Sequence, residues 1–217
     1  YNKVDIIRID HFNGFAKYWE IPASDNHGLN GKWKQGPGIP FFEKVFDKIN
    51  SKIILAEDLG EAYKDAKKIR DVFKIPGMKI LQFSFGNGDP YHEMDQNTVL
   101  YTGTHDNSTC IGWFDELLND KELNSEKNSI NLVDEVIKYI DYKPSDLIHW
   151  NMILYAMSSK ASYCIIPLQD ILGLNDNSRM NIPGTVGNNW LWRFKKETLT
   201  EAIKEKLKLI TKDVNRI

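Results

Sequence analysis

The stretch Val4-Asp5-Ile6-Ile7-Arg8-Ile9-Asp10-His11-Phe12 is a β-branched run that ends in charged residues. The run predicts a strand, and alternate residues of a strand share a face. Arg8 and Asp10 are therefore expected together at the strand's C-terminal end. Because the guanidinium of Arg8 stays charged at any working pH, it favours the ionised form of Asp10. An ionised carboxylate that is held in place is suited to act as a nucleophile.

The same arrangement recurs twice along the chain. Ile53-Ile54-Leu55-Ala56-Glu57-Asp58-Leu59-Gly60 is an apolar run with two carboxylates near its end, and Val99-Leu100-Tyr101-Thr102-Gly103-Thr104-His105-Asp106-Asn107 carries a third. A single acidic strand end favours an ordinary surface salt bridge. Three in order, two of them followed by helix-like segments, predict one shared site at the C-terminal end of a parallel barrel.

Strand-like and helix-like segments alternate along the chain, which predicts a parallel sheet. After the first strand, further strands are expected at residues 53–57, 78–85, 99–104 and 161–168. Helices are expected at 41–50, 61–73, 108–118, 129–141, 147–160 and 195–215, with a polar stretch at 119–128 and loops at 28–40 and 173–189.

Five strands are too few to close an eight-stranded barrel. The expected fold class is therefore α/β, a (β/α)8 TIM barrel in which this chain supplies the later strands, about the fourth to the eighth. The chain opens with Tyr1 rather than Met and runs directly into a strand. Residues 1–217 are expected to be the C-terminal part of a single catalytic domain, with the remainder of the same polypeptide as partner.

The composition narrows the classes of function. Charged residues make up 27% of the 217 residues and the net charge is −2, so nothing indicates nucleic acid or an anionic membrane as a partner. No apolar run reaches membrane-spanning length. Cys110 and Cys164 show no metal-site spacing and predict reduced thiols of an intracellular protein rather than a disulfide. No metal is expected.

Two carboxyl groups are what glycoside transfer with retention of configuration needs. One attacks the anomeric carbon, for which Asp10 is suited. The other gives and then takes a proton, and Glu57 is suited to that role because its apolar strand would favour the protonated form. Asp58 is the competing candidate. Strand alternation points Glu57 and Asp58 to opposite faces, so only one of them is expected in the site.

Other polar and aromatic residues suit the binding of sugars. Asp106 could hold sugar hydroxyls and steady positive charge on the ring, with His105 and Asn107 as hydrogen-bonding neighbours. The rings of Tyr18, Trp19 and Trp33 are candidate platforms for sugars. For Trp33, Trp190 and Trp192, however, core packing is the favoured interpretation. A buried ion pair is the structural alternative for Arg8 and Asp10, and a loop cap is the alternative for Asn181.

Together these motifs resemble those of the 4-alpha-glucanotransferases, also called amylomaltases or disproportionating enzymes, which are relatives of the alpha-amylases. The resemblance runs from Asp5 to about Phe194, in the family's order. The motifs that carry it are Arg8-Ile9-Asp10-His11-Phe12, Ala56-Glu57-Asp58-Leu59-Gly60 and Tyr101-Thr102-Gly103-Thr104-His105-Asp106-Asn107, supported by Tyr18-Trp19-Glu20-Ile21-Pro22, Pro76-Gly77-Met78-Lys79, Leu81-Gln82-Phe83, Arg179-Met180-Asn181, Pro183-Gly184-Thr185, Asn189-Trp190 and Trp192-Arg193.

The resemblance implies a role for each of seven residues. Asp10 is implied as nucleophile, Glu57 as acid/base and Asp106 as stabiliser of the transition state. Arg8 is implied as the partner of Asp10, while the residues implied to line sugar subsites are His11, His105 and Asn181. Alpha-1,4-glucans and maltooligosaccharides are the implied substrates, with no organic cofactor and a cytoplasmic location, or a plastid one in a plant or alga.

Three places depart from the family's usual pattern. Asn13 stands where Arg is common, Ser108 stands where an acidic residue usually follows the His-Asp-Asn, and the segment Tyr91-His92-Glu93-Met94-Asp95 differs from the usual segment that contains Pro-His. None of these changes removes a catalytic group, although the binding of the acceptor could be altered. Two alternative functions stay open: a hydrolase of the same glucans, and a glucan-binding protein that has lost catalysis. The oligomeric state stays open as well.

Overall fold

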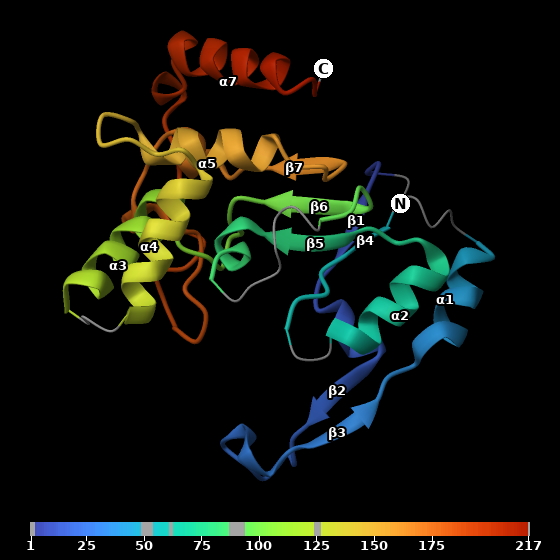
Figure 1. Ribbon diagram of the computed structural model, residues 1–217. Coiled ribbons are helices and arrows are strands. Elements are labelled where there is room, and N and C mark those ends of the chain that lie inside the picture. The colour runs from blue at the N-terminus through green and yellow to red at the C-terminus, as the bar shows by residue number, and fades with distance from the viewer. Residues whose placement is uncertain (1–2, 49–53, 61–62, 87–93, 124–126, 217) are drawn as a thin grey trace. The chain divides into compact units, whose positions relative to one another are not determined.

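The computed structural model describes residues 3–48, 54–60, 63–86, 94–123 and 127–216. Its contacts divide the chain into two units, and Figure 1 labels the elements of both. Unit 1 contains residues 1–78 and 97–99, and unit 2 contains residues 79–96 and 100–217. None of the helices within the described ranges has the length and apolar character that crossing a membrane requires.

A parallel pair of strands forms the centre of unit 1. β1 (Ile7–Ile9) pairs with β4 (Ile54–Ala56), with Ile7 opposite Ile54 and Ile9 opposite Ala56. The Ala56 N–H donates to the carbonyl of Pro76, 2.9 Å away, just before the next strand begins. The first two predicted strands are confirmed, although both are shorter than expected, and Ile53 lies outside the described residues.

Two helices cover an aromatic core in unit 1. They are α1 (Gly38–Phe46) and α2 (Tyr63–Phe73). Phe42 of α1 is fully buried and its ring lies 5.2 Å from that of Phe12, which belongs to the short 3-10 helix η1 (Phe12–Phe15). α1 begins before the predicted residue 41 because prolines are tolerated in a first helical turn. The predicted ends at 49–50 and 61–62 lie outside the described residues.

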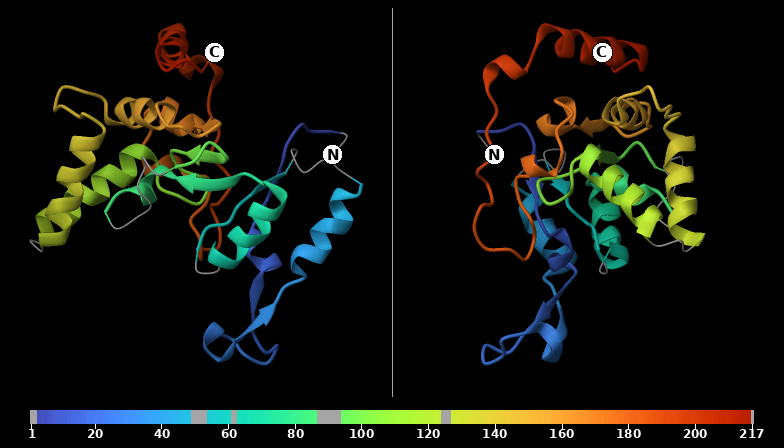
Figure 2. Two further views of the ribbon diagram at one scale, coloured as in Figure 1. Left: turned by 45° about the vertical axis from the view of Figure 1, so that its right-hand side comes forward. Right: turned by 90° about the vertical axis from the view of Figure 1, so that its left-hand side faces the viewer.

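The predicted loop at 28–40 is wrong in part, because it contains a strand of a β-hairpin. β2 (Lys17–Glu20) pairs antiparallel with β3 (Lys32–Gln35), and Trp19 lies opposite Trp33 with ring centroids 5.3 Å apart. Such cross-strand aromatic pairs stabilise hairpins. Gly31 lies against the Trp19 indole, where a Cβ would collide. The hairpin turn includes the 3-10 helix η2 (Gly28–Asn30), and both views of Figure 2 show the hairpin projecting from α1 and α2.

A three-stranded sheet is built in the order β5–β6–β7. The strands are β5 (Gly77–Ile80), β6 (Thr98–Tyr101) and β7 (Tyr163–Ile165), and their arrows point the same way in Figure 1. All three predicted strands are confirmed but are shorter than expected. β5 ends at Ile80 because the following residues form the 3-10 helix η4 (Leu81–Ser84), which buries Leu81. Apolar content alone does not distinguish such a turn from a strand.

The end of the fifth predicted strand is also corrected. Residues 168–171 form the short helix α6 (Leu168–Ile171) instead of continuing the strand, because Pro167 cannot donate a hydrogen bond to a sheet. Gln169 and Asp170, which directly follow the predicted strand, lie on this helix and are buried.

Helices pack beside this sheet in unit 2. They are α3 (Cys110–Leu123), α4 (Lys127–Tyr139), α5 (Ile148–Met157) and α7 (Glu201–Asp213), with two further 3-10 turns, η6 (Asp176–Ser178) and η7 (Lys196–Thr198). Figure 1 shows α3 beside α4, with α5 next to them. α3 continues to residue 123, well into the polar stretch predicted to separate two helices, since polar residues are tolerated on an exposed helix face.

The last helix packs on unit 2 through an apolar face. Ile203, Leu207 and Ile210 of α7 contact a cluster formed by Trp150, Ile153 and Met157. The helix begins later than predicted, because the Thr200 side chain accepts from the Ile203 N–H and caps it. Both cysteines are free, with Cys110 buried and Cys164 partly buried.

We expect Arg70→Met to lower the free energy of unfolding of the full-length protein by about 3–5 kcal/mol, because it removes the cation from a buried ion pair. Arg70 Nε lies 2.8 Å from Asp58 Oδ2, and the two side chains are only 8% and 1% exposed. Lys67→Met, which breaks an exposed pair with Asp71, should cost no more than about 0.5 kcal/mol. Urea unfolding measures both, and equal losses would contradict the prediction.

Candidate active site

Arg8 and Asp10 form an ion pair at the C-terminal end of β1. Arg8 Nη1 lies 2.7 Å from Asp10 Oδ1. The side chain of Asp10 is 74% exposed, so this is not the buried structural pair that the sequence left open as an alternative. The carboxylate therefore keeps a fixed cationic partner while its second oxygen remains open to other groups.

The carboxylate of Glu57 lies beside the turn that follows Asp10. Glu57 Oε2 accepts from the His11 N–H at 2.8 Å, and Oε1 accepts from the Leu59 N–H at 3.3 Å. Backbone hydrogen bonds also join the two segments. The Glu57 N–H donates to the Ile9 carbonyl, and the Phe12 N–H donates to the Glu57 carbonyl. Parallel pairing of β1 with β4 thus brings two predicted site residues, Asp10 and Glu57, to adjacent strand ends.

His11 enters this cluster through its backbone. The residue has a left-handed backbone, with φ of 46°, and the next residues form η1. This turn directs the His11 N–H toward Glu57 and places the exposed imidazole against Gly14. Asn13, one of the three departures from the family pattern, is buried and donates from Nδ2 to the carbonyl of Leu59. Residues 91–93 of another departure lie outside the described residues.

Asp58 points away from this cluster. It is 1% exposed, its Oδ1 accepts from the Met78 N–H at 3.0 Å and its Oδ2 pairs with Arg70. Glu57 is only partly buried. The two carboxylates therefore face opposite sides, as strand alternation predicts, and Asp58 serves to join β4, α2 and β5 of unit 1.

A second cluster forms around Asp106 in unit 2, after the end of β6. Asn181 Nδ2 donates to Asp106 Oδ1 at 2.6 Å, and His105 Nε2 lies 3.3 Å from Asp106 Oδ2. The Asn181 N–H also donates to the His105 carbonyl at 3.0 Å. The fold thus brings together three predicted site residues, one of them from a segment far along the chain.

Two further residues belong to this second cluster. Arg179 Nη2 donates to the Asp106 carbonyl at 2.8 Å and Nη1 donates to the Ser108 hydroxyl at 3.1 Å. The ring of Trp190 lies 5.0 Å from that of His105. Both occur in motifs quoted above, but Arg179 had no assigned role. Core packing was the favoured interpretation of Trp190 and Trp33, and it is wrong, because they are 51% and 46% exposed.

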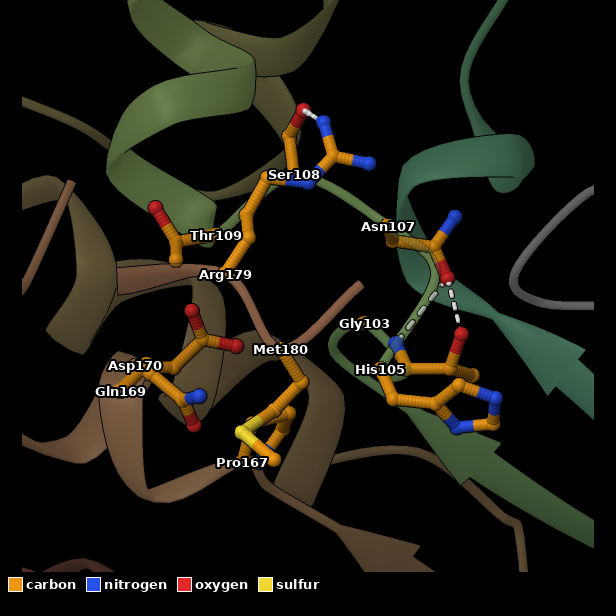
Figure 3. Close-up of a pocket in the computed structure, with 11 residues that line it drawn as sticks. Gly103, His105, Asn107, Ser108, Thr109, Pro167, Gln169, Asp170, Arg179 and Met180 are labelled. Carbon is orange, nitrogen blue, oxygen red and sulfur yellow. Dashed lines mark hydrogen bonds between the residues drawn. The ribbon is translucent and has the colours of Figure 1, made fainter. Parts of the chain in front are cut away.

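A cavity of about 170 Å³ adjoins this second cluster. In Figure 3, Ser108 and Arg179 lie on one side of the view and His105 and Asn107 on the other. Asn107 Oδ1 accepts from the N–H and the hydroxyl of Thr104, at 3.0 and 2.7 Å, and so shapes the loop between them. Polar side chains such as Asn107, Gln169 and Arg179 contribute to the lining together with the apolar groups of Pro167 and Met180.

Neither thiol chemistry nor a metal centre is indicated in these clusters. Burial raises the pKa of the Cys110 thiol well above its usual range, so the thiol stays protonated at neutral pH and is a poor nucleophile. Within the described ranges, His, Cys, Asp and Glu side chains do not gather in groups of three or more that could hold a metal ion. Carboxylates are the reactive groups that both clusters offer.

The model of the 4-alpha-glucanotransferase family matches residues 1–200 of the chain. The chain belongs to the 4-alpha-glucanotransferase family. Among curated members, the enzyme of Synechocystis is 40% identical over 214 residues, which is 96% of this chain and 40% of that protein. The chloroplastic/amyloplastic enzyme of Solanum tuberosum is 41% identical over 198 residues, which is 89% of this chain and 32% of that protein.

Solved structures agree with this family membership. An amylomaltase from Streptococcus agalactiae in complex with acarbose matches with a TM-score of 0.88 and 35% identity, over 99% of this chain and 42% of that one. An amylomaltase from Corynebacterium glutamicum shares the fold at a TM-score of 0.66 and 17% identity, over 94% of this chain and 34% of that one. This chain thus spans between 32% and 42% of the length of these four relatives, and its α/β fold is theirs.

Proposed function

We propose that the full-length protein transfers a segment of an alpha-1,4-glucan to glucose or to a maltooligosaccharide acceptor. The reaction would be a retaining double displacement through a covalent glycosyl-enzyme intermediate. The observation that carries the proposal is the arrangement at the ends of β1 and β4. The carboxylate of Glu57 accepts from the N–H of His11, the residue after the Arg8–Asp10 ion pair. A charged carboxylate and a second carboxyl group are thus held on neighbouring strands.

Each of the two carboxyl groups has a separate task. Asp10 attacks the anomeric carbon as the glycosidic bond breaks, and the ion pair with Arg8 orients its carboxylate. Glu57 gives its proton to the departing glycosidic oxygen and later takes a proton from the acceptor hydroxyl. Asp58 is unsuited to either task, because its buried carboxylate is paired with Arg70. This pairing supports Glu57 as the acid/base residue.

Asp106 is proposed as the stabiliser of positive charge on the sugar ring. Its contacts with Asn181 and His105 support that role, since they hold the carboxylate in one orientation before the substrate arrives. His11, His105 and Asn181 are proposed to bind sugar hydroxyls. The exposed rings of Tyr18 and Trp19 are proposed as stacking surfaces.

We further propose that residues 1–217 form the C-terminal part of a single TIM-barrel domain and supply about its fourth to eighth strands. Five predicted strands are present, and β1 runs parallel to β4. The chain spans 40% of its Synechocystis relative, which leaves room for the remaining strands in a complete protein. Completion of the sugar subsites would then depend on the rest of the polypeptide.

Incubation of the full-length protein with maltotriose tests the proposed activity. We expect longer oligosaccharides together with glucose, because the glycosyl-enzyme is intercepted by a sugar hydroxyl rather than by water. Chromatography of the products separates the alternatives. Shorter sugars alone would indicate a hydrolase, and an unchanged maltotriose profile would indicate a binding protein. The relative from Streptococcus agalactiae was solved in complex with acarbose, so we also expect acarbose to bind this protein.

Residues 1–217 expressed alone should not be a monodisperse, active monomer. An interrupted barrel presents strand edges with unpaired N–H and C=O groups, and such edges pair with other chains. β1 and β7 would lie at these edges in the proposed order. Measurement of the mass in solution and of the action on maltotriose checks both statements. An active monomer would show that the proposed domain organisation is wrong.

A further inference from the structure

One buried carboxylate joins both ends of the loop that carries Asp106. Asp170 Oδ2 accepts from the Thr102 hydroxyl at 2.6 Å, directly after β6. Asp170 Oδ1 accepts from the Cys110 N–H at 2.7 Å, at the first residue of α3. Asp170 is 1% exposed and Thr102 is fully buried. The residues on either side of the loop 103–109 are therefore both hydrogen-bonded to the same buried side chain.

Both hydrogen bonds are expected to be strong, because the acceptor is a buried carboxylate. A hydroxyl bonded to a carboxylate at this distance is charge-assisted, and water does not compete for it in a buried position. The first N–H groups of a helix lack partners within the helix, and Asp170 supplies one for α3. Burial raises the pKa of the Asp170 carboxyl, while the contacts with Cys110 and Thr102 lower it. Loss of either contact would leave a buried polar group without its partner.

Asp170 does not itself hydrogen-bond to the groups proposed to act on the sugar. Those groups are oriented by other contacts: Asp106 by Asn181 and His105, and its backbone by Arg179. The contacts with Asn181, His105 and Arg179 orient Asp106 within the loop, whereas Asp170 binds the two residues that flank the loop. The placement of the loop can be changed by mutation without removing the contacts of Asp106, because Thr102 lies outside the loop and its hydroxyl donates to Asp170.

We propose that Asp170 is a positioning residue for the transfer reaction, in which its buried carboxylate fixes the distance between the end of β6 and the start of α3 and thereby the placement of Asp106. The proposal rests on the proposed function of Asp106. Charge on the sugar ring develops in the transition state, so a displaced Asp106 affects turnover more than substrate affinity.

A pair of Thr102 variants tests the proposal in the full-length protein. Thr102→Val keeps the shape of the side chain but removes the hydroxyl, whereas Thr102→Ser keeps the hydroxyl. We expect Thr102→Val to lower kcat on maltotriose about tenfold to a hundredfold with KM within about twofold of wild type. Thr102→Ser should stay within about twofold of wild type in both constants. Equal kcat values for the two variants would overturn the proposal, as would a change confined to KM.

Hydrogen exchange supplies a readout that needs no substrate. The amides of residues 103–109 should exchange faster in Thr102→Val than in wild type, with Thr102→Ser unchanged. Unchanged exchange in Thr102→Val would overturn the proposal even if activity fell. If wild type fails to disproportionate maltotriose, the proposed function is wrong, and the exchange result alone then decides whether Asp170 positions the loop.

Two variants of Asp170 itself keep the proposal testable if Thr102→Val does not fold. In Asp170→Asn the amide oxygen can accept from the Cys110 N–H and the amide nitrogen can donate to the Thr102 hydroxyl. We therefore expect Asp170→Asn to retain more turnover than Asp170→Ala, measured on protein with native circular dichroism. Equal turnover of these two variants would contradict a role that depends on the two hydrogen bonds.

Discussion

Asp10→Asn should lower the transferase turnover of the full-length protein at least about a thousandfold, because it removes the proposed nucleophile. The amide keeps the size of the carboxylate but cannot form the glycosyl ester. Asp10 is largely exposed and pairs with the neighbouring Arg8, so the substitution should leave the fold intact. The initial rate of glucose release from maltotriose measures the loss.

A matched variant and a binding assay separate chemistry from affinity. Asp5→Asn changes an exposed carboxylate on the approach to the same strand and should leave turnover within about twofold of wild type. Affinity of Asp10→Asn for acarbose should change far less than turnover, because ground-state contacts with sugar hydroxyls remain. Turnover of Asp10→Asn within about tenfold of wild type would exclude Asp10 as the nucleophile.

Glu57→Gln should lower turnover on maltotriose by about 10²–10⁴-fold, the range expected for loss of general acid–base catalysis. The amide can still accept from the His11 and Leu59 N–H groups through its one oxygen, so local structure should persist. A maltosyl fluoride donor needs no proton on its leaving group. The release of fluoride in the first turnover of Glu57→Gln should therefore be much less impaired than cleavage of maltotriose, whereas later turnovers still need Glu57 as the base toward the acceptor hydroxyl.

The contrast between two donors makes the assignment of Glu57 testable. Glu43→Gln, an exposed change on α1, serves as the control and should behave as wild type with both donors. Equal impairment of Glu57→Gln in cleavage of maltotriose and in first-turnover release of fluoride would show that Glu57 is not the proton donor. Asp58→Asn should instead reduce stability, because it weakens the buried pair with Arg70.

Local sequence patterns predicted most of the strands because burial and backbone alternation act over a few residues. β1, β4 and β7 fall within predicted segments, and β5 and β6 each begin one residue before theirs. The ends of the elements were less predictable. The β2–β3 hairpin was missed because its stability comes from the cross-strand pair of Trp19 and Trp33, which the linear sequence separates by a glycine-rich turn.

The sequence by itself determined the family of this protein and the identity of its candidate carboxylates, because motif residues at strand ends are local features. Only the tertiary structure decided which carboxylates are paired and how. In the structure, Asp58 forms a buried ion pair, Asn181 donates to Asp106, and Asp170 accepts hydrogen bonds from both the end of β6 and the start of α3. These contacts link residues that are distant in the chain, so their distances and burial follow from packing and not from any local pattern.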